Sequence, residues 1–183
     1  DDQLFTQPDG CHRGECPICF IPLPINPQKS IMKACCSKSI CEGCLHANYM
    51  SGNFNCPFCR EPAPKDDEEE KRMMKRAKAN DPAAFCQIGA QRYNERDYGG
   101  AIKYWTKAAE FGDIRAHYQL GCMYRKGEGV EKDGEKVVYH MEQAAIGGHP
   151  IARNNLGCIE EENGNTERAV KHFIIAANLG YDD

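Results

Sequence analysis

The sequence predicts two units of different kinds, a small cysteine-rich domain followed by an all-α helical-repeat solenoid. Two observations lead to this fold class. Nine of the twelve cysteines lie before residue 60, and from residue 81 onward alanines and glycines recur every 32 to 36 residues. Because a recurring period of that length is typical of stacked helix pairs, the second part is expected to be a repeat array. A chain of 183 residues has room for two small domains.

The cysteines of the first unit occur in close pairs. Three pairs have the Cys-x-x-Cys spacing and a fourth pair is vicinal, giving eight thiols: Cys16 and Cys19, Cys35 and Cys36, Cys41 and Cys44, Cys56 and Cys59. Two residues between thiolates let one tight turn present both sulfurs to a tetrahedral zinc ion at about 2.3 Å. Eight thiols are the number that two such sites require. A disulfide framework is the alternative, and the close pairing disfavours it.

The order of these pairs, x15 after Cys19, x4 after Cys36 and x11 after Cys44, resembles the RING finger family, a small α+β fold stabilised by zinc. In that family the ligand pairs are interleaved. The resemblance implies one zinc ion on Cys16, Cys19, Cys41 and Cys44 and a second on Cys35, Cys36, Cys56 and Cys59. Both are expected to be structural, because four protein ligands leave no position for an activated water.

The sequence departs from the usual RING pattern at one position, where Lys38 stands in place of a histidine ligand. The match is therefore to the all-cysteine subtype. That subtype separates its third and fourth ligands by one residue, whereas Cys35 and Cys36 are adjacent. His46 is the alternative ligand, although its place just after Cys44 fits poorly. Cys11 and His12 are expected to be non-ligands.

The resemblance also implies a function. RING domains commonly act as ubiquitin ligases that hold a ubiquitin-charged conjugating enzyme and supply no nucleophile, so no catalytic residue is assigned. Ile18, Pro57 and Phe58 match the enzyme-docking groove of the family. Arg60, which follows the eighth ligand, matches a linchpin that contacts both ubiquitin and the conjugating enzyme, and its fork of donors suits that task.

A non-catalytic zinc-binding adaptor is the alternative function. Lys38 favours it, as does Asn48, which stands where the family often has an aromatic residue, although the neighbouring Tyr49 is a partial substitute. In that interpretation Ile18 is a small core residue and Arg60 an ordinary surface arginine.

The expected domain boundaries follow composition. Residues 1–10 are expected to be a disordered N-terminal segment, residues 11–61 the finger, residues 62–80 a charged helical linker and residues 81–183 the repeats. Prolines at 62 and 64 end the finger, and acids then precede bases, as a helix dipole favours. Glu68 and Arg72 have i,i+4 spacing, so the linker is expected to be an exposed helix.

The repeat pattern consists of small residues at fixed offsets. Ala84 and Gly89 recur as Ala116 and Gly121 and as Ala152 and Gly157, while an Ala-Ala-x-x-Gly motif recurs at residues 108–112, 144–148 and 176–180. Each unit is expected to be a helix pair, with proline in a first turn and glycine as a left-handed cap. The pattern resembles the Sel-1-like repeat, a relative of the tetratricopeptide repeat, over residues 82–183.

A solenoid of helix pairs typically presents a surface that binds peptides or proteins, so a protein substrate or adaptor is the expected partner of the repeats. Aromatic residues at helical spacing are expected to form inter-repeat core more often than groove lining: Trp105, Tyr104, Tyr118 and Tyr124. The three late cysteines, Cys86, Cys122 and Cys158, are expected to be small buried residues.

Charge and hydropathy exclude several function classes. The formal net charge of −4 disfavours nucleic acid as the main partner. No apolar run approaches the roughly 18 residues of a membrane span, and no secretory leader is seen, so we expect a reducing intracellular location, in the cytoplasm or nucleus, and no membrane partner. The sequence begins without methionine and stops within the repeat pattern, which is compatible with truncation at both ends.

Overall fold

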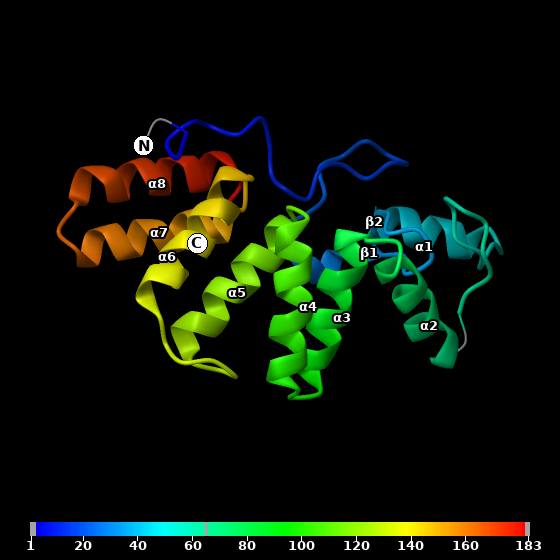
Figure 1. Cartoon of the computed structure of the whole chain (residues 1–183). Helices are drawn as coiled ribbons and strands as arrows, with labels where there is room; N and C mark the ends of the chain where they lie inside the picture. Colours follow the sequence, from blue (N-terminus) through cyan, green and yellow to red (C-terminus); the bar gives the residue numbers. More distant parts are fainter. Residues whose placement is uncertain (1–2, 65, 182–183) are drawn as a thin grey trace.

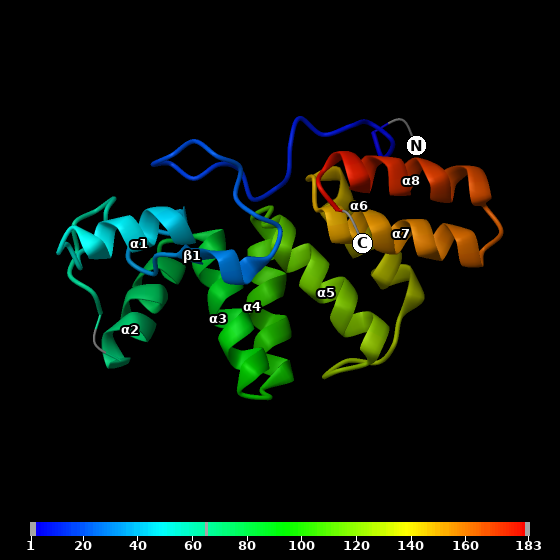
Figure 2. The same ribbon diagram turned by 180° about the vertical axis from the view of Figure 1, so that it is seen from behind.

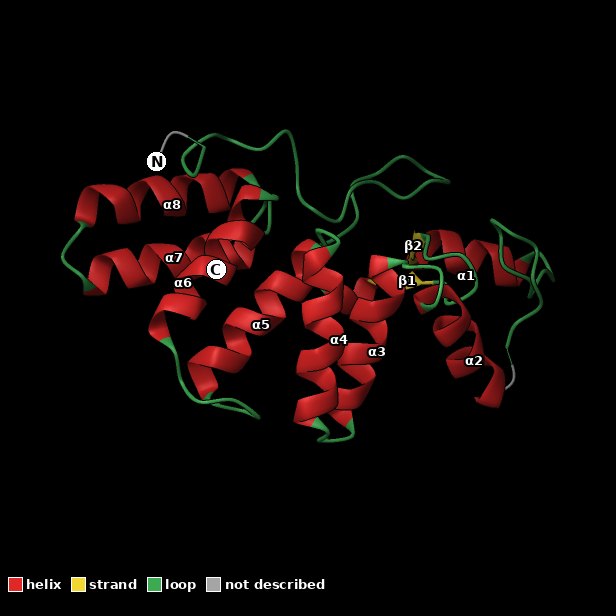
Figure 3. Cartoon of the chain, in the orientation of Figure 1, coloured by secondary structure: helices red, strands yellow, loops and turns green. Residues whose placement is uncertain are grey.

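The computed structural model describes residues 3–64 and 66–181, a row of helices with a small finger at one end (Figures 1 and 2). The described residues are mainly helical, and the two short strands lie in the finger (Figure 3). Among these residues, no helix combines the length and apolar character that crossing a bilayer requires. We use "finger" for residues 11–61 and "array" for residues 82–181.

The finger has α+β character. A short 3-10 helix, η1 (Pro27–Lys29), leads into β1 (Ser30–Met32), which pairs antiparallel with β2 (Ser39–Cys41), and α1 (Glu42–Met50) follows at once. Cys41 ends β2 and caps α1, because its sulfur accepts the backbone N–H of Cys44. The buried core holds only four described residues, Cys16, Leu23, Ile40 and Leu45.

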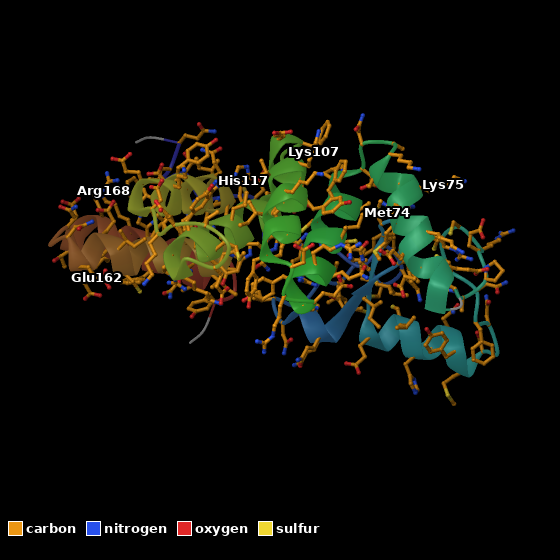
Figure 4. The ribbon with its side chains drawn as sticks, turned by 60° about the horizontal axis from the view of Figure 1, so that its bottom comes forward. Met74, Lys75, Lys107, His117, Glu162 and Arg168 are labelled. Carbon is orange, nitrogen blue, oxygen red and sulfur yellow. The ribbon has the colours of Figure 1, made fainter. Side chains whose placement is uncertain are left out.

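Helix α2 (Asp66–Ala77) is more than the exposed linker expected from its charges. Met73 and Ala77 are buried in the core of the first repeat, and Met74 packs against it from the side of α2 that faces α3 and α4, while Lys75 lies on the outer side (Figure 4). The predicted Glu68–Arg72 ion pair forms at 3.4 Å. Apolar side chains one turn apart therefore make α2 a cover for the array.

The array consists of three helix pairs, as the repeat pattern predicts. All six helices have 13 residues: α3 (Pro82–Asn94), α4 (Tyr98–Glu110), α5 (Ile114–Lys126), α6 (Gly134–Ile146), α7 (Pro150–Glu162) and α8 (Thr166–Asn178). Pro82 and Pro150 occupy first-turn positions. Gly112, Gly148 and Gly180 follow the second helix of each pair with φ of 79°, 82° and 90°, the left-handed conformation that favours glycine.

The recurring glycine of each first helix is where a large side chain of the second helix rests. Trp105 lies on Gly89, Met141 on Gly121 and Phe173 on Gly157. A Cβ built on Gly89 would stand 2.6 Å from the Trp105 ring, and Trp105 is only 1% exposed. The small residues of the pattern thus allow the two helices of a pair to approach closely.

The four aromatic residues expected in the core of the array pack in or against its buried clusters. Trp105 is buried and its indole N–H donates to the Cys86 carbonyl at 3.1 Å, while Tyr104, Tyr118 and Tyr124 pack at the edges of the buried clusters. The prediction for the cysteines holds only for Cys86. Cys122 is half-buried and Cys158 is exposed.

Residues 3–13, the last three of which begin the finger, run along the array (Figure 1). Disorder was expected up to residue 10. Leu4 is 7% exposed and packs into the core of the second and third repeats, and its carbonyl accepts from the buried Arg153 guanidinium. The backbone N–H of His12 donates to the Gly148 carbonyl at 3.1 Å. The segment therefore ties the finger to the far end of the array.

The contact at Gly89 gives a stability prediction. Gly89→Ala should lower the free energy of unfolding of the array by about 1 to 3 kcal/mol, because the added methyl group meets the buried Trp105 ring. Gly134→Ala is the matched control, since a Cβ there meets nothing within 4 Å. Urea denaturation measures both, and equal stability of the two variants would show that the glycine–tryptophan contact is not tight.

Candidate metal centre

The structure gathers eight cysteines of the finger into two clusters of four. Within each cluster the sulfur atoms all lie within 4.8 Å of one another. The first cluster consists of Cys16, Cys19, Cys41 and Cys44, and the second of Cys35, Cys36, Cys56 and Cys59. These two sets are those that the family resemblance implies, so each cluster joins segments that are distant in the sequence.

The sulfur spacing fits a metal ion. Four sulfurs at about 2.3 Å from a tetrahedral zinc ion stand about 3.8 Å from one another. The Sγ atoms of Cys19 and Cys41 are 3.8 Å apart, and those of Cys36 and Cys56 are 3.7 Å apart. The Cys35–Cys59 sulfur distance is shorter, at 3.3 Å. Both clusters could therefore hold a metal ion with little movement of their side chains.

Two matching turns present the first and last cysteine pairs. The backbone N–H of Phe20 donates to the Cys16 carbonyl at 2.8 Å, and that of Arg60 donates to the Cys56 carbonyl at 2.9 Å. Phe20 and Arg60 both adopt left-handed backbone conformations, with φ of 59° and 62°. The residue after each of these two Cys-x-x-Cys pairs therefore closes the turn. Because the two residues have similar backbone conformations, their side chains leave the two turns in the same way.

A third tight turn brings the vicinal pair to one point. The backbone N–H groups of Cys36 and Ser37 both donate to the Lys33 carbonyl, at 3.2 and 2.8 Å, and Ser37 has φ of 55°. The turn folds the chain sharply between β1 and β2. Adjacent thiols of Cys35 and Cys36 consequently both reach the second cluster, although the family subtype spaces these ligands by one residue.

Within each cluster, the pKa of one cysteine is lowered and the pKa of another is raised. Burial raises the pKa of Cys16, but hydrogen bonds from backbone groups outweigh it and lower the pKa to about 6. A hydrogen bond with the Cys41 thiol raises the pKa of Cys44 to about 12. In the second cluster, backbone hydrogen bonds outweigh burial and lower the pKa of Cys56 to about 7, whereas burial and the Cys59 thiol raise that of Cys35. Four neighbouring thiols can all be deprotonated together when a positive charge, such as that of a metal ion, balances them.

The other candidate ligands lie outside both clusters. Lys38, at the position of the usual histidine, places its ammonium 5.5 Å from the centre of the Phe58 ring. His46 is exposed on α1. The Cys11 sulfur is 3.5 Å from Nδ1 of His12, and neither residue belongs to a cluster.

The residues expected to contact a conjugating enzyme lie on the two matching turns. Ile18 is 45% exposed, Arg60 is exposed, and Pro57 and Phe58 are half-buried, with Phe58 packed on the finger core. Sequence reasoning missed Phe20 and Ile21, which are 72% and 64% exposed and extend the apolar surface around Ile18. The run Phe-Ile-Pro directly after a Cys-x-x-Cys pair was the available signal.

Comparison with known proteins identifies the second unit. The family model for the Sel1 repeat matches residues 94–113, 114–149 and 150–181, and the last two matches begin at the first residues of α5 and α7. Residues 94–181 are Sel1 repeats.

Two solved structures agree with this assignment. The crystal structure of a Sel1 repeat protein from Oxalobacter formigenes is similar with a TM-score of 0.60 and 28% identity, covering 74% of this chain and 56% of that one. A protective antigen of uropathogenic Escherichia coli with an SLR fold has a TM-score of 0.55 and 31% identity, covering 61% and 26%. DAP3-binding cell death enhancer 1 of Rattus norvegicus is 31% identical over 98 residues, half of this chain and 19% of its own length. The chain spans less than a fifth of the curated relatives it matches.

Metal removal should separate the two units. We expect a strong chelator to unfold the finger, because its four-residue core cannot replace the metal, while the array keeps its helices. Limited proteolysis should then cut within residues 14–64 and spare residues 82–181. Cys56→Ser should act like the chelator, and Cys158→Ser, an exposed cysteine outside both clusters, is its control. A finger that stays protease-resistant after chelation would contradict a structural metal.

Proposed function

We propose that the chain is a RING-type ubiquitin ligase, in which the finger recruits a ubiquitin-charged conjugating enzyme and the Sel1 repeats hold a protein substrate or partner. The observation that carries the proposal is the interleaving of the two cysteine clusters, since the first and third pairs meet at one point and the second and fourth pairs at another. Two structural zinc ions held by these eight thiols would supply rigidity and no chemistry on the substrate.

The interleaving supports a docking surface made of two separate turns. Ile18 stands in the turn of the first pair and Pro57 in the turn of the last pair, about forty residues later in the chain. The first turn is joined through its cluster to α1, and the last turn is joined through the other cluster to the β1–β2 turn. Because β2 runs directly into α1, metal ions in the two clusters would fix both turns to the unit formed by β1, β2 and α1. A conjugating enzyme would then meet a preformed surface.

Arg60 is suited to contact two partners at once. The backbone N–H of Arg60 donates a hydrogen bond to the Cys56 carbonyl, which fixes its backbone. Its side chain is exposed and forms no ion pair within the described part of the chain. A guanidinium offers five donors in a planar fork. In ubiquitin transfer it would position ubiquitin against the conjugating enzyme, and the nucleophile would come from the substrate.

The Sel1 repeats supply the second half of the proposal. Stacked helix pairs present an extended surface to other proteins, and the name of the rat relative describes binding to a protein. The net charge of −4 also favours a protein partner over nucleic acid.

A non-catalytic adaptor remains the second candidate, and two contacts favour it. Lys38 lies over the Phe58 ring on the proposed docking surface, adding a positive charge there. Asn48 donates to the carbonyls of Asn53 and Asn55 at 2.6 and 3.3 Å, so it serves the fold of the loop after α1 instead of presenting an aromatic ring.

Autoubiquitination with a panel of conjugating enzymes separates the two functions. The wild-type chain should form ubiquitin conjugates with at least one enzyme, and Arg60→Ala should reduce the rate by about tenfold or more, as loss of a charge-assisted hydrogen bond does. Arg96→Ala, an exposed arginine that also has positive φ, is the matched control and should keep full activity. Full activity of Arg60→Ala would rule out the linchpin, and a zinc-loaded wild type inactive with every enzyme would favour the adaptor.

A further inference from the structure

A cavity lies between the finger and the array, with lining residues from all three repeats. It consists of two adjoining hollows of about 330 and 340 Å³ that share five lining residues: His12, Arg13, Met32, Ser39 and Arg115. The finger contributes the strand residues, and the array contributes the start of α5. Neither the metal clusters nor the proposed docking turns line it, so any ligand here belongs to a separate site.

Arg13 is a cation without a matching anion. Its guanidinium donates to the Ser30 hydroxyl, and its buried Nε has no acceptor among the described residues. No carboxylate in the described part of the chain forms an ion pair with it. Burial, and then the nearby charge of Arg115, lower the pKa of Arg13. A partly buried charge and a buried donor without an acceptor are both unfavourable unless a partner compensates them.

Arg115 brings a second guanidinium to the same cavity from the array. It pairs with Asp113 at 3.0 Å, and Asp113 also caps α5 by accepting the N–H of Ala116. Among the described residues Asp113 is the only carboxylate that lines the cavity, and its ion pair with Arg115 leaves Arg13 without one. Asp81, which precedes the lining residue Pro82, is paired with Arg76. The cavity consequently keeps a positive excess.

Neutral groups complete the lining. His12 and His149 stack with ring centres 4.3 Å apart, and burial lowers their pKa values to about 4 and about 2, so both rings are uncharged at neutral pH. The hydroxyls of Ser30 and Ser39 line the cavity beside Arg13. The site thus combines two guanidinium groups with hydroxyl donors.

We propose that this interdomain cavity binds a phosphate group, held between Arg13 of the finger and Arg115 of the array. A phosphate monoester presents three acceptor oxygens and close to two negative charges, which matches two guanidinium forks and serine hydroxyls better than a single carboxylate does. Binding would offset the repulsion between the two arginines and link the finger to the repeats. The site does not depend on ubiquitin transfer.

Calorimetric titration of the zinc-loaded full chain tests the site. The probes are inorganic phosphate, a short phosphoserine peptide and the same peptide without phosphate, each at matched ionic strength. Saturable binding of a phosphate-bearing probe is expected, with no binding of the unphosphorylated peptide. Arg13→Gln should weaken the affinity at least about tenfold, since it removes a charge-assisted contact. Arg96→Gln, remote from the cavity, should bind like the wild type.

The two phosphate probes identify the source of the ligand. Tighter binding of the peptide indicates a phosphorylated protein segment, and equal binding indicates a free small anion; both results support the site. Arg115→Gln provides a second variant from the other domain, and metal content with the helical circular dichroism signal checks that each variant is folded. Absence of saturable binding by either phosphate probe, or unchanged affinity in both folded variants, would overturn the proposal.

Discussion

The convergence of four thiols at each of two points is the interaction on which the finger depends. The described core of the finger contains Cys16, Leu23, Ile40 and Leu45, and burying so few side chains cannot offset the conformational entropy of about fifty ordered residues, at roughly 1 to 2 kcal/mol each. The clusters join each end of the finger to its centre, so the same thiol clusters that bring the fold together also set the distance between the two outer turns. Stability and the proposed docking surface therefore share one cause.

The array is stabilised by a different principle, the close approach of helices at recurring small residues. Its cores extend past its own helices, because α2 supplies Met73 and the N-terminal segment supplies Leu4. Arg76 reaches from α2 to the Ala34 carbonyl of the finger at 3.0 Å. Finger and array are thus held together at several points around a positively charged cavity, which makes their relative placement a property that a bound anion could alter.

Local patterns made much of this predictable. The Cys-x-x-Cys spacing specifies a contact within one short turn. The recurring glycines specify a contact within one helix pair, so the helix pairs could be predicted: Gly89, Gly121 and Gly157. The contacts of Leu4, of Met73 and of Arg13 could not be foreseen in the same way, because they join segments whose sequences carry no shared period. The vicinal pair Cys35 and Cys36 was predictable only in part, because the family resemblance alone assigned both residues to one cluster. The turn that is closed by the Lys33 carbonyl explains how the adjacent thiols reach one point.

Native mass spectrometry of the full chain, purified under reducing conditions without added chelator, tests the central claim most directly. If two interleaved clusters hold the finger together, the folded chain carries two zinc ions with all eight cluster thiols deprotonated, and the mass of the denatured chain shows twelve reduced cysteines. A folded chain that carries no zinc, or whose cluster cysteines are joined as disulfides, would contradict it.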